Sequence, residues 1–270
     1  MSIKQNKTAE IELAAATTKY QEKKETDFLY WQIMLQRMKV LPSGDRVLLD
    51  AGCGSGTFGL SIVNGKASVV GIDICKTAVY SGKAKSKKQK LDFLSIVGDL
   101  ENLPLKDNSL DTYLCRAALH HFLCIDSVVE EIKRVLKPGG VIVFIEPNGS
   151  NPIVKLSTFG EKLSGNLLLS LGLDTPNETI HDHICYLEAL EQQGFSCVRI
   201  SSCYPGSLPP LPQESSGSTE RRVAINFVQG LVKLRQFCYF AASKLLTQPF
   251  NGNVLLITAR KLNCAYDSSS

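Results

Sequence analysis

The segment that most constrains the fold of this chain is Val47-Leu-Leu-Asp50-Ala-Gly52-Cys-Gly54-Ser-Gly56-Thr-Phe58-Gly59. A short apolar run ends in an acid and is followed by glycines at every second position, which is typical of a buried strand entering a tight loop. Glycine suits such a loop because it adopts positive φ and, lacking a Cβ, lets the backbone approach a ligand. Residues 58–63 should open a helix, whose unpaired N–H groups favour a carboxylate or phosphate.

The spacing of these glycines distinguishes between ligands. A dinucleotide-binding loop has glycines at its first, third and sixth positions, whereas the sixth position counted from Gly52 is Thr57. The pattern here is Asp-x-Gly-x-Gly-x-Gly, which resembles the S-adenosylmethionine loop of the class I methyltransferases. For the loop taken alone, a tight turn that binds no ligand remains the alternative.

Two further apolar segments also end in an acid. Residues 67–74 form an expected strand that ends at Asp73, about twenty residues beyond the first glycine, where a carboxylate can accept hydrogen bonds from ribose hydroxyls. Residues 93–100 form another, ending at Asp99 and Leu100, where an acid can accept from an exocyclic amino group and a leucine can lie against a purine. For Asp73, capping of the next helix is the alternative.

Three later segments make the resemblance specific. They are Gly98-Asp99-Leu-Glu-Asn-Leu-Pro-Leu-Lys-Asp-Asn-Ser-Leu-Asp111, Leu119-His120-His121-Phe122, and residues 132–148 around Lys137-Pro138-Gly139-Gly140. Together with the glycine loop, residues 45–150 are similar to the small-molecule class I methyltransferases, a group that includes enzymes acting on quinone precursors. The resemblance implies a doubly wound α/β fold, with a seven-stranded, mostly parallel sheet whose last strand is antiparallel. We expect a fourth strand at residues 110–115 and a turn at Lys137-Pro-Gly-Gly before the fifth.

The resemblance also implies which residues hold the cofactor, S-adenosylmethionine. These are Asp50, Ala51, Gly52, Cys53, Gly54 and Gly56 around the methionine moiety, Asp73 and Ile74 at the ribose, Asp99 and Leu100 at the adenine, and Cys115 and Arg116 beside the methionine end. The implied reaction is methyl transfer to a small organic acceptor, which leaves S-adenosylhomocysteine. The methylated atom, whether oxygen, nitrogen or carbon, stays open.

Few residues of such an enzyme need to be catalytic, because the cofactor supplies the reactivity and the protein positions both partners. An oxygen or nitrogen acceptor can need a base, and His120 and His121 are the candidates because neutral imidazole takes a proton near pH 7. The alternative is that both histidines only begin a helix. Candidate acceptor contacts are Tyr30, Trp31, His121, Asn148 and His183. For the two aromatic residues, packing of a helix face is the alternative.

The chain divides into a core interrupted by two insertions. The expected parts are an N-terminal helical cap at residues 1–45 that stops at Leu41-Pro-Ser-Gly, a cofactor-binding core at 46–148, an acceptor-capping insertion at 149–183, a helix and strand at 184–202, a second insertion at 203–252, a last strand at 253–262 and a disordered tail at 263–270. The second insertion contains an apolar helix at 223–246. That helix could roof the acceptor pocket, form a dimer contact or attach to a membrane surface.

Charge and cysteine content exclude several other classes. A net charge of +4 does not indicate a polyanionic partner, and the basic run at residues 83–90 lacks interleaved aromatics, so no nucleic-acid binding is expected. The nine cysteines include no CxxC pair and favour a reducing cytoplasm, and the polar N-terminus contains no secretory signal. No apolar stretch is long enough to span a bilayer. We expect a monomer or a homodimer.

Two competing functions remain from the residues alone. Metal chemistry is not expected, because His181, Asp182, His183 and Cys185 would not all converge from one short segment and no second ligand group is evident. A non-catalytic protein that binds S-adenosylmethionine or a partner would keep the glycine loop but lack acceptor chemistry. An NAD-dependent dehydrogenase shares the fold, although the glycine spacing disfavours it.

Overall fold

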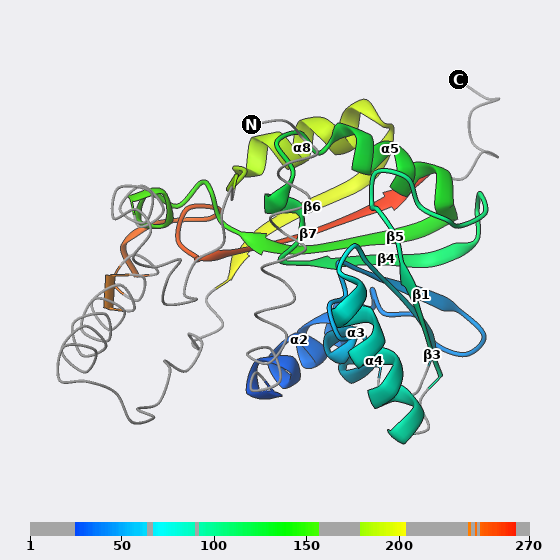
Figure 1. Ribbon diagram of the computed structural model, residues 1–270. Coiled ribbons are helices and arrows are strands. Elements are labelled where there is room, and N and C mark those ends of the chain that lie inside the picture. The colour runs from blue at the N-terminus through cyan, green and yellow to red at the C-terminus, as the bar shows by residue number, and fades with distance from the viewer. Residues whose placement is uncertain are drawn as a thin grey trace, which may run out of the picture.

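The computed structural model describes residues 25–63, 67–89, 92–156, 179–203, 237–238, 241 and 244–262. Its centre is a seven-stranded sheet with the order β3-β2-β1-β4-β5-β7-β6 (Figure 1). The strands are β1 Val47–Ala51, β2 Ser68–Asp73, β3 Phe93–Val97, β4 Leu110–Arg116, β5 Leu136–Pro147, β6 Phe195–Cys203 and β7 Val254–Lys261. β7 runs antiparallel to both β5 and β6, and the other pairs are parallel. The predicted doubly wound sheet with an antiparallel last strand is confirmed.

Helices lie on both faces of the sheet. They are α2 Glu25–Arg37, α3 Thr57–Val63, α4 Lys76–Gln89, the short 3₁₀ helix η1 Leu119–His121, α5 Asp126–Val135 and α8 His183–Gln192. α2, α3 and α4 lie on one side, and α5 and α8 lie on the other (Figure 1). None of the helices in the described ranges is long and apolar enough to cross a bilayer.

Two apolar layers hold the helices to the sheet. Phe28 and Trp31 of α2 pack with Ile62 of α3 on one face, whereas Ile132 of α5 packs with Tyr186 of α8 on the other. The central strands contribute side chains to both layers, so they are buried on both faces. The chain order reverses direction between β1 and β4, so ligands are expected at the carboxyl ends of these strands.

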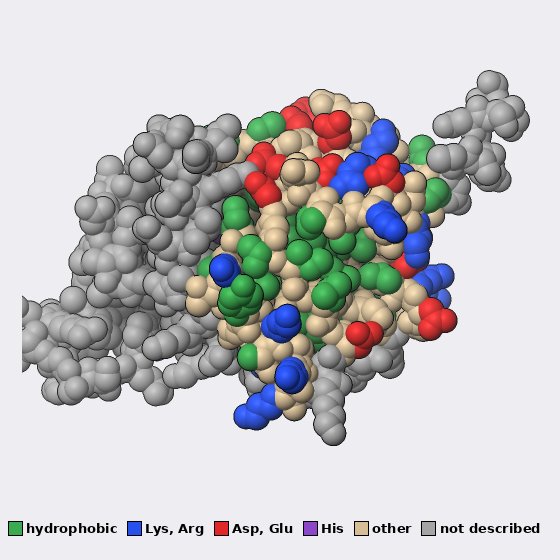
Figure 2. Space-filling model, turned by 45° about the vertical axis from the view of Figure 1, so that its right-hand side comes forward, with side chains coloured by type: hydrophobic (Ala, Val, Ile, Leu, Met, Phe, Trp, Pro, Cys, Tyr) green, Lys and Arg blue, Asp and Glu red, His purple; other side chains and the backbone are tan. Residues whose placement is uncertain are grey.

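The outer strand β3 is less well covered. Residues 98–109, which connect β3 to β4, contain no helix, and Leu94 and Val97 of β3 are 59% and 45% exposed. Figure 2 shows apolar side chains gathered in the middle of one face of the molecule, bordered by charged ones. The edge strand β3, two positions from the β1 strand that carries the glycine loop, is therefore only partly covered.

Two boundaries differ from the sequence prediction. α2 ends at Arg37, before the predicted stop at Leu41, and the chain then turns with Lys39 at a φ of 54°. The predicted separate turn at 137–140 is wrong, because β5 already begins at Leu136. Leu136 pairs with Leu110, the next pair is Thr112 with Val141, and residues 137–140 bulge between them with Gly139 at a φ of 76°. Pairing with β4 on both sides of the bulge turns the expected turn into an irregular start of the strand.

The predicted domain boundaries stay predictions. Most of both insertions, at residues 157–178 and 204–236, lies outside the described residues, as does most of the predicted helix at 223–246. The predicted cap over the acceptor site and the N-terminal residues 1–24 also lie there. The described core contains the cofactor-binding positions that the sequence singled out.

Candidate functional site

The glycine loop connects β1 to α3 at the carboxyl edge of the sheet. Gly52, Gly54 and Gly56 all have positive φ, at 66°, 52° and 71°. A Cβ added to Gly52 would lie 2.5 Å from the Cβ of Ala118, in the turn after β4. The prediction that this loop needs glycine is confirmed, for reasons of both backbone conformation and close approach.

Asp50 lies in β1 directly before this loop and is only 2% exposed. Its Oδ2 accepts a hydrogen bond from the backbone N–H of Gly59 in α3, at 3.0 Å. Burial raises the pKa of Asp50 to about 7, against the opposing effects of the Gly59 N–H and of Arg116. Among the described residues none donates a hydrogen bond to Oδ1, so this acid retains accepting capacity on that oxygen.

Asp73, at the end of β2, binds the same loop from the other side. Its Oδ2 accepts from the N–H of Gly54 at 2.7 Å, and its Oδ1 accepts from the N–H of Cys75 at 2.8 Å, just before α4. Burial raises the pKa of its carboxyl group. Each carboxylate oxygen has a second lone pair, so the predicted ribose contact stays a prediction beside this structural role.

Asp99 and Leu100 follow β3 in the connection to β4. The Oδ1 of Asp99 accepts from the N–H of Glu101 at 3.1 Å, and Leu100 is 6% exposed within the core. Ile74 is half-buried beside Asp73. The predicted adenine and ribose positions therefore lie at the carboxyl ends of the adjacent strands β2 and β3, next to the glycine loop.

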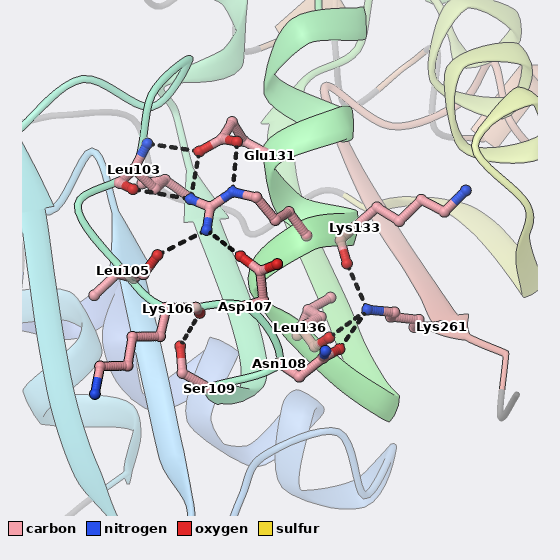
Figure 3. A network of polar contacts seen from close by, with 11 residues as sticks. Leu103, Leu105, Lys106, Asp107, Asn108, Ser109, Glu131, Lys133, Leu136 and Lys261 are labelled. Carbon is pink, nitrogen blue, oxygen red and sulfur yellow. Dashed lines mark hydrogen bonds and ion pairs between the residues drawn. The ribbon is translucent and has the colours of Figure 1, made fainter.

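The connection that carries Asp99 is tied to α5 by a polar network, which Figure 3 shows. Arg134 donates to the carbonyl oxygens of Leu103 and Leu105, at 2.9 and 2.7 Å, and pairs with Asp107 at 2.7 Å. Glu131 pairs with Arg134 and accepts from the N–H of Leu103 at 2.7 Å. A single guanidinium thus fixes three positions of a connection that contains no helix.

Arg116, at the end of β4, is the cation whose charge acts on Asp50. Its guanidinium carbon lies 4.7 Å from the ring centroid of Phe58 and 5.6 Å from that of Phe28, which is cation–π geometry. Its charge lowers the pKa of Asp50. Cys115, which precedes it, is fully buried. An acid before the loop and a cation at the end of the neighbouring strand are therefore electrostatically coupled, a pair of charges that could bind a zwitterionic ligand.

The turn after β4 carries both predicted catalytic histidines. Nδ1 of His120 lies 2.8 Å from Oε2 of the buried Glu146 at the end of β5. The rings of His120 and His121 have centroids 4.3 Å apart. Burial, and then the neighbouring His120, lower the pKa of His121 to about 4, so this imidazole is neutral at pH 7.

Glu146 is the functional candidate that the sequence prediction missed. The signal was present, because Val141-Ile-Val-Phe-Ile-Glu146 is an apolar strand that ends in an acid, the same pattern that marked Asp50 and Asp73. Its partner could not be identified from the sequence, because residues 120 and 146 become neighbours only through the parallel pairing of β4 with β5.

The residues predicted to contact the acceptor differ in burial and in hydrogen bonding. Trp31 is 2% exposed in the core, and Tyr30 packs edge-on against it at 5.1 Å; burial and Cys203 raise the pKa of Tyr30 to about 12. Asn148 is fully buried and donates to the carbonyl oxygens of Pro249 and Gly252, at 2.7 Å each. Both protons of the Asn148 side-chain amide are therefore donated to carbonyl oxygens of the segment before β7.

His183 begins α8, and its Nδ1 lies 2.6 Å from Oγ of Ser150. His181 binds the carbonyl oxygen of Phe122 through Nε2 at 2.8 Å, and its Nδ1 lies 3.5 Å from Sγ of Cys185. Within the described ranges, no group of three or more histidine, cysteine and acidic side chains is arranged to hold a metal ion.

Comparison with known proteins gives three kinds of match. A family described as "Methyltransferase domain" matches residues 49–144. The 2-phytyl-1,4-naphtoquinone methyltransferase of Synechocystis is 35% identical over 121 residues, which are 43% of this chain and 50% of that protein. The demethylmenaquinone methyltransferase of Staphylococcus saprophyticus is 30% identical over 129 residues, which are 46% and 54%.

Among solved structures, geranyl diphosphate C-methyltransferase from Streptomyces coelicolor, in complex with S-adenosyl-L-homocysteine, superposes with a TM-score of 0.60. It is 16% identical, with 86% of this chain and 79% of that chain covered, so this likeness concerns the fold. The chain spans about half the length of the relatives it matches in sequence. The family match covers residues 49–144 of the 270, and over that range the chain is similar to a methyltransferase domain.

Proposed function

We propose that this protein transfers a methyl group from S-adenosylmethionine to a small, partly apolar organic acceptor. The observation that carries the proposal is the glycine loop: Asp73 binds the N–H of Gly54, and the buried Asp50 binds the N–H of Gly59 in the helix that follows. This arrangement places backbone N–H groups, an acid and the cation Arg116 at one end of the sheet, where open α/β folds bind their ligands.

The described residues fit the cofactor by charge. Asp50 would accept from the α-amino group of the methionine moiety, and Arg116 would bind its α-carboxylate. Asp73 and Ile74 would contact the ribose, and Asp99 and Leu100 the adenine. When bound, the sulfonium supplies a methyl group that is already activated toward a nucleophile, so the protein needs chiefly to orient the acceptor and exclude water.

His120 is the better candidate for the base that takes the acceptor's proton. The acceptor's lone pair would form the new bond to the methyl carbon, the S–C bonding pair would return to sulfur, and the released proton would move to imidazole. His121 is a weak base, because its pKa is lowered to about 4. The buried carboxylate on Nδ1 of His120 instead stabilises the charge that this ring would acquire on taking the acceptor's proton.

The named relatives support one class of acceptor. Two of them are quinone methyltransferases, and a structural neighbour methylates geranyl diphosphate. We therefore infer a quinone precursor or another metabolite with an isoprenoid-like apolar part. The candidate contacts are Tyr30, His121 and His183, with the methylated atom left open.

The cytoplasm is the proposed location. Among the described cysteines no two form a disulfide, in keeping with a reducing compartment. A monomer or a homodimer is proposed, with no nucleic-acid partner. Peripheral contact of the segment at 223–246 with a membrane is the secondary possibility.

Isothermal titration calorimetry tests the cofactor. We expect S-adenosylmethionine and S-adenosylhomocysteine to bind and NAD not to bind. The Asp50→Asn variant should bind S-adenosylmethionine at least about tenfold more weakly, since a charge-assisted hydrogen bond contributes about 1.5–3 kcal/mol. The exposed Asp45→Asn change, close by in sequence, is the matched control. Binding of NAD in place of both sulfur compounds would overturn the proposal.

A labelled methyl donor then tests the reaction. Incubation with quinone precursors, phenols, amines and carboxylic acids should label one acceptor class. Cofactor binding without transfer to any member of the panel would favour the non-catalytic alternative, in which the protein binds S-adenosylmethionine for another purpose.

A further inference from the structure

The carboxylate of Glu146 is completely buried at the end of β5, with a side-chain exposure of 0%. A buried charge is costly unless its oxygens are hydrogen-bonded and a cation or strong donor is close. The hydrogen bond from His120 lowers the pKa of Glu146, although burial alone would raise it. The fold therefore holds an ionised acid in its interior, and its partners show what it does there.

Three of those partners come from one short turn, and the fourth is the buried thiol of Cys115 in β4, whose Sγ lies 3.8 Å from Oε1. Oε1 accepts from the backbone N–H groups of Ala118 and Leu119, at 2.9 and 3.0 Å. Oε2 binds Nδ1 of His120 at 2.8 Å. Three consecutive residues after β4 are thereby fixed by a single side chain from the neighbouring strand.

This turn is strained and touches the glycine loop. Ala117 has a φ of 53°, a conformation that residues with a Cβ rarely adopt, and its N–H donates to the carbonyl oxygen of Ile145 at 2.9 Å. The next residue, Ala118, packs closely against Gly52: a Cβ added to Gly52 would lie 2.5 Å from the Cβ of Ala118. Because Ala118 and Gly52 are in close contact, a shift of the turn would displace the loop that is proposed to hold the cofactor.

The carboxylate also determines which nitrogen of His120 carries the proton. A carboxylate only accepts hydrogen bonds, so Nδ1 must be the donor, and in the neutral ring Nε2 is then the basic nitrogen. The other titratable groups packed here are His121, Cys115, Tyr113 and Tyr186. The pKa of His121 is lowered by burial, and the pKa values of Cys115, Tyr113 and Tyr186 are raised well above normal by burial, so all four are neutral at pH 7.

We propose that Glu146 is a positioning residue of the methyltransferase site: it holds His120 with Nδ1 protonated and Nε2 as the proton acceptor, and it keeps Ala118 against Gly52. The role in transfer rests on the proposed function, whereas the proton position does not. The Glu–His pair thus joins the proton-accepting side of the site to the glycine loop through one turn.

Glu146→Gln separates these two effects. The amide oxygen can still accept from Ala118 and Leu119, but the amide nitrogen now faces Nδ1 and can only donate. His120 must then accept at Nδ1 and carry its proton on Nε2, which removes the basic lone pair from that atom. Loss of an outer partner of this kind typically lowers activity about 10- to 100-fold. The exposed Glu130→Gln change on α5 is the matched control.

Histidine ¹⁵N NMR on the full chain reads the proton position directly, and four histidines make the spectrum assignable with a His120→Gln variant. We expect the Nδ1–H tautomer for His120 in the parent protein and in Glu130→Gln, and the Nε2–H tautomer with a lower titration midpoint in Glu146→Gln. An Nε2–H tautomer in the parent protein would overturn the proposal, even if the variant failed to fold.

Methyl transfer gives the second readout. In the parent protein the acidic limb of the kcat profile should follow the His120 titration, and in Glu146→Gln kcat should fall while the Kd for S-adenosylmethionine changes less than about threefold. An unchanged kcat, or equal losses in affinity and kcat with the parent tautomer retained, would contradict the positioning role. If the tautomer is as expected but neither S-adenosylmethionine nor its product binds, only the proposed function fails.

Discussion

Asp50 and Glu146 are two acids at the carboxyl ends of buried strands, yet their surroundings set opposite charge preferences. Their exposed fractions are 2% and 1%. The pKa of Asp50 is raised to about 7, whereas that of Glu146 is lowered. Burial raises both, so the difference comes from the partners: Asp50 receives one backbone N–H and lies near Asp73, whereas Glu146 receives two N–H groups and an imidazole.

This difference separates the acid that is proposed to bind the cofactor, Asp50, from the acid that holds a turn of the fold, Glu146. Both carboxylate oxygens of Glu146 already accept hydrogen bonds from the turn after β4, so this acid is committed to holding that turn. Asp50 accepts a single hydrogen bond, and its pKa of about 7 means that both charge states are populated near neutral pH. A cation that binds beside Asp50 would therefore stabilise its ionised form. From their burial alone, the two acids would be expected to have similarly raised pKa values.

The largest loss of stability should come from removing the side chain of Glu146, the acid with more hydrogen-bond partners. Glu146→Ala leaves two N–H groups and an imidazole without their acceptor, and we expect a loss of about 3–5 kcal/mol in the free energy of unfolding. Urea denaturation measures it, with Glu130→Ala as the exposed control, expected within about 0.5 kcal/mol. A loss for Glu146→Ala as small as that of the control would show that the buried pair contributes little.

A pH series should show the opposite signs of the two acids. The folded pKa of Asp50 is raised, so its stabilising contribution is complete below its ordinary value of about 4 and is lost as pH rises through about 7. Relative to the parent, the free energy of unfolding of Asp50→Asn should therefore be higher at pH 7.5 than at pH 4.5, by about 3 kcal/mol. Glu146 is the reverse case, since its contribution is present at neutral pH and lost in acid.

Urea unfolding of the parent and of Asp50→Asn at these two pH values provides the measurement. The comparison uses the difference between the two proteins, because other titrating groups then cancel. An equal difference at both pH values would mean that Asp50 is ionised throughout, and the contrast with Glu146 would disappear.

Gly59→Ala tests the contact that holds Asp50. Alanine in a helix is normally favoured over glycine by about 1 kcal/mol, but a Cβ here would lie 2.6 Å from Oδ2 of Asp50. We expect a net destabilisation of about 1–2 kcal/mol from this overpacking. In the Asp50→Ala background the same change should recover most of that loss, and a double-mutant cycle with no coupling would contradict the contact.

The smallest effect is expected at the exposed network of Figure 3. The Arg134 and Asp107 side chains are 31% and 68% exposed, so their ion pair is screened by solvent. Arg134→Met should cost about 1 kcal/mol, mainly through its bonds to the Leu103 and Leu105 carbonyl oxygens, and high salt should reduce the effect only slightly. A loss as large as that for Glu146→Ala would show that burial is not what separates the two networks.

Most of the core could be predicted because its signals are local. The strands ending at Asp50 and Asp73 are apolar runs followed by glycine or an acid, and they occur as predicted. The bulge at 137–140 was not predictable in this way, because Pro-Gly-Gly has the same local chemistry in a turn and in an irregular strand. Pairing with β4 decides between them.

The candidate site also contains residues that local sequence patterns predict and residues that only strand pairing brings together. Glycine positions followed from spacing, whereas the Glu146–His120 pair depends on strand register, which no local pattern contains. Trp31 also shows the limit: its aromatic cluster suited both a substrate lid and a packed helix face, and its burial reflects contacts between α2 and α3 that sequence periodicity leaves open. The acceptor contacts remain predictions, because both insertions lie mostly outside the described residues.

The most direct test of the central claim is calorimetric titration of S-adenosylmethionine at pH 6.0 and 7.5. If its α-amino group meets Asp50, binding should release a proton at pH 6.0, visible as a dependence of the heat on buffer ionisation, and should be about tenfold tighter at pH 7.5. Asp50→Asn should bind more weakly and lose both effects. Absence of binding, or binding by the parent protein with no proton release and no change in affinity with pH, would contradict the account.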